Sequence, residues 1–276
     1  MKNVSDAKNY NFDVIILAGQ SNAQGNGSCP AEKKYHNDDV LELDENSLTL
    51  YGYGSLDYSS ECDFEIKYAE YRKNDFRRLA DFSESFADCY IADGLLKADR
   101  KILIVKSAVG GTGFSLSQWG VGNPLHTRLK DMINYALSLN PNNKLKAFLW
   151  HQGEHDAYEQ PELSPADREK FYYDSLKKTI DDIRESFNVP DLPVVTGEMV
   201  NDWADKNKQN TSVIENATKR VCADVGFAGT ASSDGLLSNA QIIEGNPDDI
   251  HFCADSIEEL GKRYFAIYKN IISANK

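Results

Sequence analysis

The chain of 276 residues lacks long hydrophobic runs and carries a clear excess of acidic side chains. Its first seventeen residues hold one short apolar stretch, which starts at Asp13 and is too brief for a signal peptide or a membrane span. Asp and Glu number 43 against 30 Lys and Arg, so the net charge is −13. This charge repels phosphate backbones and anionic lipid surfaces, and we expect neither nucleic acid nor a membrane as a partner.

Cysteine is also scarce, and its spacing forms no CxxC pair. The five cysteines are Cys29, Cys62, Cys89, Cys222 and Cys253. An odd number without such spacing argues against a disulfide framework and against a thiolate zinc site. We expect a cytoplasmic protein for the chain as given, or a secreted one if a leader has been removed.

The composition that remains, 41% hydrophobic and 26% charged, is typical of a globular protein and excludes disordered and fibrous classes. Apolar runs of strand length, each followed by glycine and polar residues, lie at 14–18, 102–105, 145–150 and 192–196. Segments with the 3.6-residue apolar spacing of helices lie at 82–95, 125–139, 171–187 and 256–272. This alternation predicts a three-layer α/β/α sandwich with a central parallel sheet.

The domain organisation follows from what interrupts this pattern. No repeat, low-complexity tract or linker divides the chain, so we expect a single domain over residues 1–276. A segment at about 29–73 departs from the alternation, being acidic and tyrosine-rich with short alternating pieces at 40–43 and 48–53. We interpret this segment as a hairpin or a long insertion beside the ligand crevice.

The crevice of an open α/β sheet lies beyond the carboxyl ends of its strands, so the residues that follow each strand are the candidates for chemistry. Ser21 follows the first strand on a tight turn that could present its Oγ as a nucleophile, although the same position suits a helix N-cap. The glycine-rich run 108–113 follows the second long strand. Its backbone N–H groups could hold an oxyanion or cradle a phosphate, or the run could form an ordinary turn.

A dense polar cluster, HQGEHD, follows the strand predicted at 145–150. It matches the HxxEH pattern, in which two histidines on one helical face, here His151 and His155, bind zinc. Gly153 and the strand before the cluster place it on a turn, where residues four apart need not share a face. A zinc-dependent hydrolase is therefore the alternative hypothesis.

The last candidate feature is an Asp and His pair on the loop before the final helix. Asp248 stands three residues before His251, and a carboxylate there could fix the imidazole tautomer whose Nε2 accepts a proton from a hydroxyl. The same residues could form an exposed acidic turn. Because all four features fall at the strand ends where one crevice would form, together they indicate a catalytic site.

These four blocks resemble the SGNH hydrolase superfamily, and within it the sialate O-acetylesterase and acetylxylan esterase-like carbohydrate esterases. The blocks are LAGQSNAQG at 17–25, AVGGTG at 108–113, WHQGEHDA at 150–157 and DDIHF at 248–252. The resemblance spans nearly the whole chain and implies a flavodoxin-like fold. It also implies a serine esterase that needs no cofactor or metal and removes acetyl groups from sugar hydroxyls of an oligo- or polysaccharide through an acyl-serine intermediate.

The resemblance assigns roles position by position. Ser21 matches the nucleophile, His251 the general base and Asp248 the acid that orients it. Gly110 and the N–H of Ser21 match the oxyanion-hole donors, and Gln152 is assigned as a further donor where the wider superfamily has an asparagine. Glu154 is a possible supporting or alternative acid.

Several questions stay open in the sequence. Trp119 could face a sugar or pack in the core, and the tyrosines of the insertion could stack on sugar or pack: Tyr51, Tyr53, Tyr58, Tyr68 and Tyr71. A catalytically silent carbohydrate-binding protein on the same fold is a third hypothesis, which the intact set of Ser21, Asp248 and His251 disfavours. The sequence predicts neither the sugar, nor the acetyl position, nor the oligomeric state.

Overall fold

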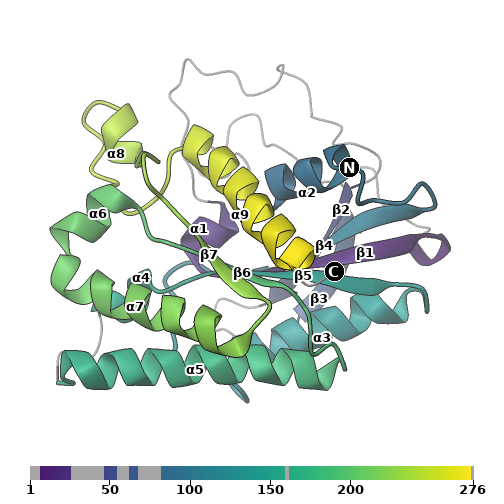
Figure 1. Cartoon of the computed structure of the whole chain (residues 1–276), viewed down its shortest axis with the longest axis horizontal. Helices are drawn as coiled ribbons and strands as arrows, with labels where there is room; N and C mark the ends of the chain where they lie inside the picture. Colours follow the sequence, from purple (N-terminus) through teal and green to yellow (C-terminus); the bar gives the residue numbers. More distant parts are fainter. Residues whose placement is uncertain (1–6, 26–46, 55–61, 68–81, 159–161, 275–276) are drawn as a thin grey trace.

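The computed structural model describes residues 7–25, 47–54, 62–67, 82–158 and 162–274. These residues form a central sheet with strand order β3-β2-β4-β1-β5-β6-β7 and helices on both faces (Figure 1). The strands are β1 (Asn11–Gly19), β2 (Ser47–Gly54), β3 (Cys62–Lys67), β4 (Arg100–Ala108), β5 (Lys144–His151), β6 (Val194–Gly197) and β7 (Ala228–Ala231). After a short 3-10 turn η1 (Ala7–Asn9), the helices are α1 (Ser21–Gln24), α2 (Phe82–Ala92), α3 (Pro124–Ser138), α4 (Glu154–Tyr158), α5 (Pro165–Ser186), α6 (Asn201–Lys206), α7 (Lys208–Val225), α8 (Asn239–Ile242) and α9 (Ala254–Ala274).

The sheet is parallel except at one edge, where β3 runs antiparallel to β2. Its central part, β4-β1-β5-β6-β7, has the doubly wound order of flavodoxin-like folds, with the switch in winding direction between β1 and β5. The predicted three-layer sandwich with a central parallel sheet is therefore confirmed. The switch point places the ends of β1 and β5 side by side.

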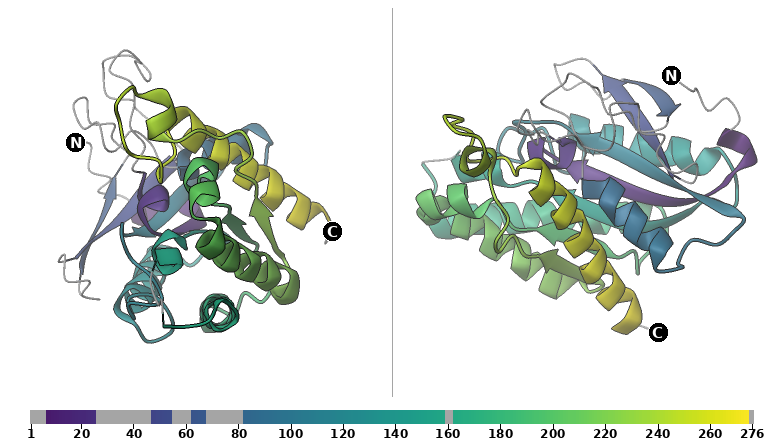
Figure 2. Two further views of the ribbon diagram at one scale, coloured as in Figure 1. Left: turned by 90° about the vertical axis from the view of Figure 1, so that its left-hand side faces the viewer. Right: turned by 90° about the horizontal axis from the view of Figure 1, so that it is seen from above.

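Strand β1 shows why the apolar runs are continuous. Val14 and Ile16 point into a core shared with α3, α5 and α7, whereas Ile15 and Leu17 point into a second core shared with α2 and α9. Figure 2 shows these two helical layers on opposite faces of the sheet. A strand covered on both faces needs apolar side chains at every position, which removes the alternation of a half-exposed strand.

The four predicted strands correspond to β1, β4, β5 and β6, and the four predicted helical segments correspond to α2, α3, α5 and α9. The apolar patterns in the sequence did not predict β7 or α7. Strands β2 and β3 pair as a hairpin within the segment 29–73 and extend the sheet, while the piece at 40–43 lies outside the described residues. In the described part of the chain, no helix combines the length and apolar character needed to cross a membrane.

Candidate active site

Ser21 stands at the turn where β1 ends and α1 begins, at the switch point of the sheet. The preceding residues hold this turn against β5, because the N–H of Gln20 donates to the carbonyl oxygen of His151 at 3.0 Å. Gly19 has φ of +140°, and a Cβ there would overlap the same carbonyl oxygen. Only glycine therefore permits this close approach, which brings Ser21 beside the polar cluster after β5.

The side chain of Gln20 ties the Ser21 turn to that cluster. Its Oε1 accepts hydrogen bonds from the Nε2 of Gln152 at 3.1 Å and from the backbone N–H of His155 at 3.2 Å. Ser21 itself is 5% exposed. The turn after β1 and the start of α4 are thus one hydrogen-bonded unit.

The residue after Ser21 connects this unit to the loop before α9. The amide Nδ2 of Asn22 donates to Glu154 Oε1 at 2.7 Å and to the carbonyl oxygen of Ile250 at 3.1 Å. Its Oδ1 accepts the N–H of Phe252 at 3.1 Å. Ile250 and Phe252 flank His251, so the structure brings the Ser21 turn and the His251 loop together.

Asp248 and His251 form a hydrogen-bonded pair, as the sequence predicts. His251 Nδ1 lies 2.8 Å from Asp248 Oδ1, which also accepts the N–H of His251 at 3.2 Å. The second oxygen, Oδ2, accepts from Asn239 Nδ2 at 2.9 Å. Because Nδ1 faces a carboxylate it carries the hydrogen, and Nε2 is left with the lone pair that a general base needs.

The charge on Asp248 fits this arrangement. Burial acts to raise the pKa of Asp248, but the hydrogen bonds from His251 and Asn239 outweigh it, so the pKa lies below the ordinary value. The next residue, Asp249, pairs with Lys206 of α6 at 2.9 Å, which fastens the same loop to its neighbour.

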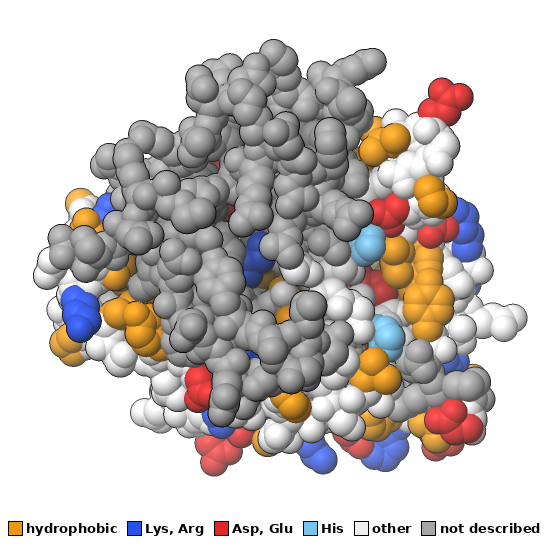
Figure 3. Space-filling view, turned by 180° about the vertical axis from the view of Figure 1, so that it is seen from behind, with side chains coloured by type: hydrophobic (Ala, Val, Ile, Leu, Met, Phe, Trp, Pro, Cys, Tyr) orange, Lys and Arg blue, Asp and Glu red, His pale blue; other side chains and the backbone are white. Residues whose placement is uncertain are grey.

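Histidine side chains are exposed among acidic and hydrophobic ones on the face shown in Figure 3.

Glu154 is completely buried and lies behind these residues. Its described contacts are the hydrogen bond from Asn22 and His151, whose Nε2 lies 3.6 Å from Oε1. Burial acts to raise the pKa of Glu154, but His151 and Asn22 outweigh it and lower the pKa, so the carboxyl group is ionised. Of the two carboxylates, Asp248 is the one that contacts His251, whereas Glu154 contacts Asn22 and His151.

The two oxyanion-hole candidates both have partners inside the protein. The N–H of Gly110 donates to Gln24 Oε1 at 3.1 Å, so this candidate donor is engaged within the protein. Gln152 is 5% exposed, and its Nε2 lies near three acceptors: Gln20 Oε1 at 3.1 Å, the Thr112 carbonyl at 3.1 Å and Asp156 Oδ2 at 2.7 Å. Turning this amide over would set its oxygen against three acceptors, so the orientation is fixed.

His151, the first member of the zinc pattern, faces the core and not the crevice. Its ring is 1% exposed, packs between Phe82 and Phe252, and places Nδ1 2.9 Å from the hydroxyl of Tyr264. The second member, His155, is partly exposed on α4. Within the described residues, no three His, Cys, Asp or Glu side chains come together in a way that could hold a metal ion.

Trp119 is a core residue. It is fully buried, donates from Nε1 to Thr112 Oγ1 at 2.9 Å and packs edge to face against Trp150 at 5.0 Å. Of the two roles considered, packing is therefore the one that the structure shows. The side chains of the tyrosine-rich segment lie outside the described part of the chain.

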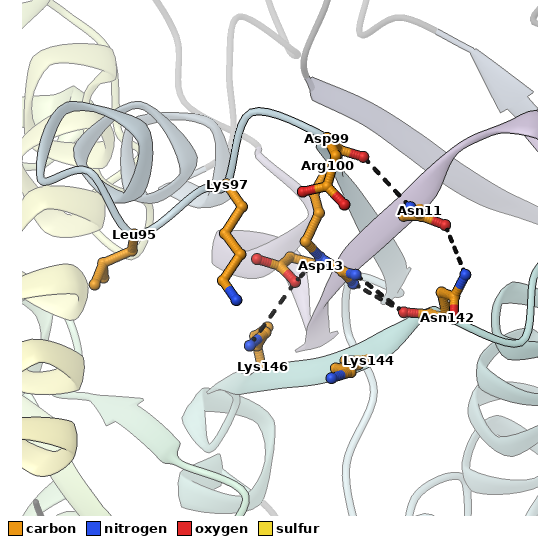
Figure 4. Close-up of a pocket in the computed structure, with 9 residues that line it drawn as sticks. All are labelled: Asn11, Asp13, Leu95, Lys97, Asp99, Arg100, Asn142, Lys144 and Lys146. Carbon is orange, nitrogen blue, oxygen red and sulfur yellow. Dashed lines mark hydrogen bonds and ion pairs between the residues drawn. The ribbon is translucent and has the colours of Figure 1, made fainter.

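A separate cavity of about 330 Å³ opens at the amino ends of the strands, beside the first residues of β1, β4 and β5 and away from the Ser21 turn (Figure 4). Arg100 donates from Nε to Asp13 Oδ1 at 2.7 Å and from Nη1 to the Asn142 carbonyl at 3.1 Å, and its Nη2 contacts the carbonyl of Phe12. Asp13, which is 2% exposed, also accepts from Tyr90 at 2.9 Å. Arg100 thus compensates a buried carboxylate far from Ser21.

Comparison with known proteins identifies the family. The sequence matches the family described as carbohydrate esterase, sialic acid-specific acetylesterase, over residues 11–270. The chain belongs to this carbohydrate esterase family. Membership confirms the resemblance drawn from the four sequence blocks and makes the protein an ester hydrolase. No curated protein shows significant similarity to the chain.

Solved structures share the fold of this esterase at low sequence identity. The structure of NanS has a TM-score of 0.73 at 16% identity and covers 96% of this chain and 98% of its own. A protein from Arabidopsis thaliana has a TM-score of 0.65 at 16% identity, with 95% and 98% covered. A carbohydrate acetylesterase from Xanthomonas citri has a TM-score of 0.60 at 18% identity, with 95% of this chain and 57% of that chain covered.

The sequence reading did not single out Asn22, although this residue makes the contacts that unite the site. Asn22 stands within the LAGQSNAQG block, so the signal was present. Its partners Ile250 and Phe252 are more than two hundred residues away, and no spacing rule links an asparagine to backbone groups at that distance. The three-dimensional structure was needed to show the connection.

Proposed function

We propose that this protein is a serine-dependent carbohydrate O-acetylesterase that hydrolyses acetyl esters on the hydroxyl groups of an oligo- or polysaccharide. One observation carries the proposal. Asp248 orients His251 on a loop that is hydrogen-bonded on both sides of the histidine to Asn22, the residue that follows Ser21. The Ser21 turn and the His251 loop are thus joined, and membership of the sialic acid-specific acetylesterase family supports the roles that we propose for them.

In this mechanism, Nε2 of His251 takes the proton of Ser21 as Oγ attacks the acetyl carbonyl carbon. The carbonyl oxygen becomes negative in the tetrahedral intermediate. Its collapse breaks the bond to the sugar oxygen, which leaves as a hydroxyl after receiving the proton from His251. Water, deprotonated by His251, then attacks the acetyl-serine, and acetate leaves with regeneration of Ser21. Asp248 stabilises the imidazolium in both halves of the reaction.

The backbone N–H groups of Ser21 and Gly110 are the proposed donors to the negative oxygen. The substrate oxygen would replace Oε1 of Gln24, which lies on a partly exposed side chain. Direct donation by Gln152 stays a prediction, because its amide hydrogens face three protein acceptors. Its proposed contribution is to fix the turn that carries Ser21 and the segment that follows Gly110.

The test compares hydrolysis of p-nitrophenyl acetate with longer acyl esters, and then acetate release from acetylated sugars, by wild type and Ser21→Ala, each with and without EDTA. We expect acetate-selective, EDTA-resistant activity that Ser21→Ala removes. Activity that survives Ser21→Ala and disappears in EDTA would support the zinc hypothesis based on His151 and His155. Sugar binding without turnover by the wild type would support a silent binding protein.

A further inference from the structure

We infer that Asn22 and Glu154 form a positioning pair that holds the His251 loop in register with the Ser21 turn. This inference rests on the proposed function, since it gives His251 the role of general base. It adds to that function two residues that touch neither the substrate nor the reacting atoms. Their effect is exerted through the backbone on both sides of His251.

The first support is the completeness of the contacts of Asn22. One amide group binds the carbonyl of Ile250 at 3.1 Å, the N–H of Phe252 at 3.1 Å and Glu154 at 2.7 Å. The side chain of Asn22 is completely buried, so water does not compete for these partners. His251 therefore cannot shift relative to Ser21 without breaking a buried hydrogen bond.

The second support is that the orientation of this amide is determined by its surroundings. Turning it over would set Nδ2 against the N–H of Phe252 and set Oδ1 against the carboxylate of Glu154. Both contacts would be repulsive, so the observed orientation is the one that gives both ends of the Asn22 amide a partner. Glu154 thus acts as the residue that selects and locks the orientation of Asn22.

The third support is the way the buried charge of Glu154 is held in place. His151 Nε2 lies 3.6 Å from Glu154 Oε1, and His151 Nδ1 lies 2.9 Å from the Tyr264 hydroxyl, which itself donates to the Trp150 carbonyl at 2.9 Å. Nε2 of His151 thus faces the carboxylate, while the Tyr264 hydroxyl holds the other side of the ring at Nδ1. A chain of buried polar groups on β5 and α9 thus supports the pair.

A displacement of about 1 Å between catalytic groups can lower a rate about a hundredfold. Asn22→Ala should therefore lower kcat for p-nitrophenyl acetate by about 10- to 100-fold while KM changes less than threefold. Asn143→Ala is the matched control. Asn143 is also a buried asparagine that bridges two backbone groups, since it accepts the N–H of Phe12 and donates to the carbonyl of Ala136, at 2.7 Å each. It lies at the amino ends of the strands, away from Ser21. The variant Asn143→Ala should lower the melting temperature and leave kcat within threefold of the wild-type value.

Two readouts separate positioning from general destabilisation. Hydrogen exchange of the Phe252 amide should accelerate at least tenfold in Asn22→Ala and stay unchanged in Asn143→Ala, because only the first variant removes its acceptor. In a His251→Ala background, Asn22→Ala should cause no further loss of activity, since a positioning residue has no effect once its target is gone. Unchanged Phe252 exchange, or a full additional loss in the double variant, would overturn the inference.

Glu154→Gln keeps the inference open to refutation if Asn22→Ala does not fold. It retains an oxygen for Asn22 but replaces a charge-assisted hydrogen bond with a neutral one, so we expect about a tenfold lower kcat and faster exchange of the Phe252 amide. Wild-type values for both would contradict the inference. Activity that persists in Ser21→Ala would instead refute the proposed function, and the exchange of Phe252 would still decide whether the pair holds the loop.

Discussion

The replacement Asp248→Asn tests which acid orients His251. In the structure, Oδ1 of Asp248 faces two donors of His251, Nδ1 and the backbone N–H, and Oδ2 faces the Nδ2 donor of Asn239. An asparagine at this position can offer an acceptor to only one side. Either its NH₂ group faces His251 and reverses the imidazole tautomer, or it faces Asn239 and sets two donors against each other.

The magnitude follows from these two orientations. If the amide oxygen still faces His251, the loss of the negative charge removes about 1.5–3 kcal/mol of charge-assisted hydrogen bonding, which corresponds to about a 10- to 150-fold loss in rate. If the NH₂ group faces His251, the tautomer is wrong and the loss approaches the roughly 10⁴-fold seen for such replacements in serine hydrolases. We therefore expect Asp248→Asn to lower kcat by about 10- to 10⁴-fold, depending on which orientation the amide adopts.

The assay is steady-state hydrolysis of p-nitrophenyl acetate, with Glu154→Gln measured in parallel. We expect KM to change less than threefold, because Asp248 does not contact the ester. A kcat within threefold of wild type would refute the assignment of Asp248. A much larger loss in Glu154→Gln than in Asp248→Asn would make Glu154 the acid of the triad.

Three further predictions concern stability. Gly19→Ala should prevent folding or lower the melting temperature by more than 10 °C, because a Cβ at residue 19 overlaps the carbonyl oxygen of His151 and because residues with side chains rarely adopt the φ of Gly19. A wild-type melting curve would contradict the close approach of β1 and β5. Arg100→Ala should cost about 1.5–3 kcal/mol in chemical denaturation, because it removes the charge-assisted hydrogen bond to the buried Asp13 and leaves Lys146, at 3.8 Å, as the cationic partner. The kcat of the folded protein should stay within threefold. No loss of stability would show that the Arg100 pair is not needed. Because the pKa of Asp248 is lowered in the folded protein, its ionised form stabilises the fold above about pH 4, and this stabilisation is lost as the pH falls through the lowered pKa. The difference in unfolding free energy between wild type and Asp248→Asn should therefore shrink from pH 6 to pH 2. A difference that stays constant over this range would contradict the lowered pKa.

The sequence predicts the elements that carry a strong hydrophobic pattern and not those that lack one. Strands β1 and β5 are apolar runs because both of their faces are covered, and their limits could be placed within a few residues. Strand β7, with the sequence AGTA, consists of small residues that carry no such pattern. Its place in the sheet comes from parallel pairing with β6, which is a tertiary effect.

The candidate site shows the same division. The polar residues that follow the strands could be found because a parallel sheet gathers its carboxyl ends at one edge, and the Asp248 and His251 pair could be found because the two residues are local. The use of each polar group could not be predicted. Whether the amide of Gln152 is available to a substrate depends on Asp156 and Thr112, and whether Glu154 or Asp248 faces His251 depends on contacts between distant segments.

The most direct test of the central claim, that Ser21 is the nucleophile activated by His251, is covalent labelling. The protein is treated with a serine-directed phosphonate and the modified residue is mapped by peptide mass spectrometry, with His251→Ala as the comparison. We predict a single adduct on Ser21 that forms together with loss of esterase activity, and much slower labelling in His251→Ala. Full activity in the presence of excess phosphonate, or inactivation with the adduct at another residue, would contradict the account.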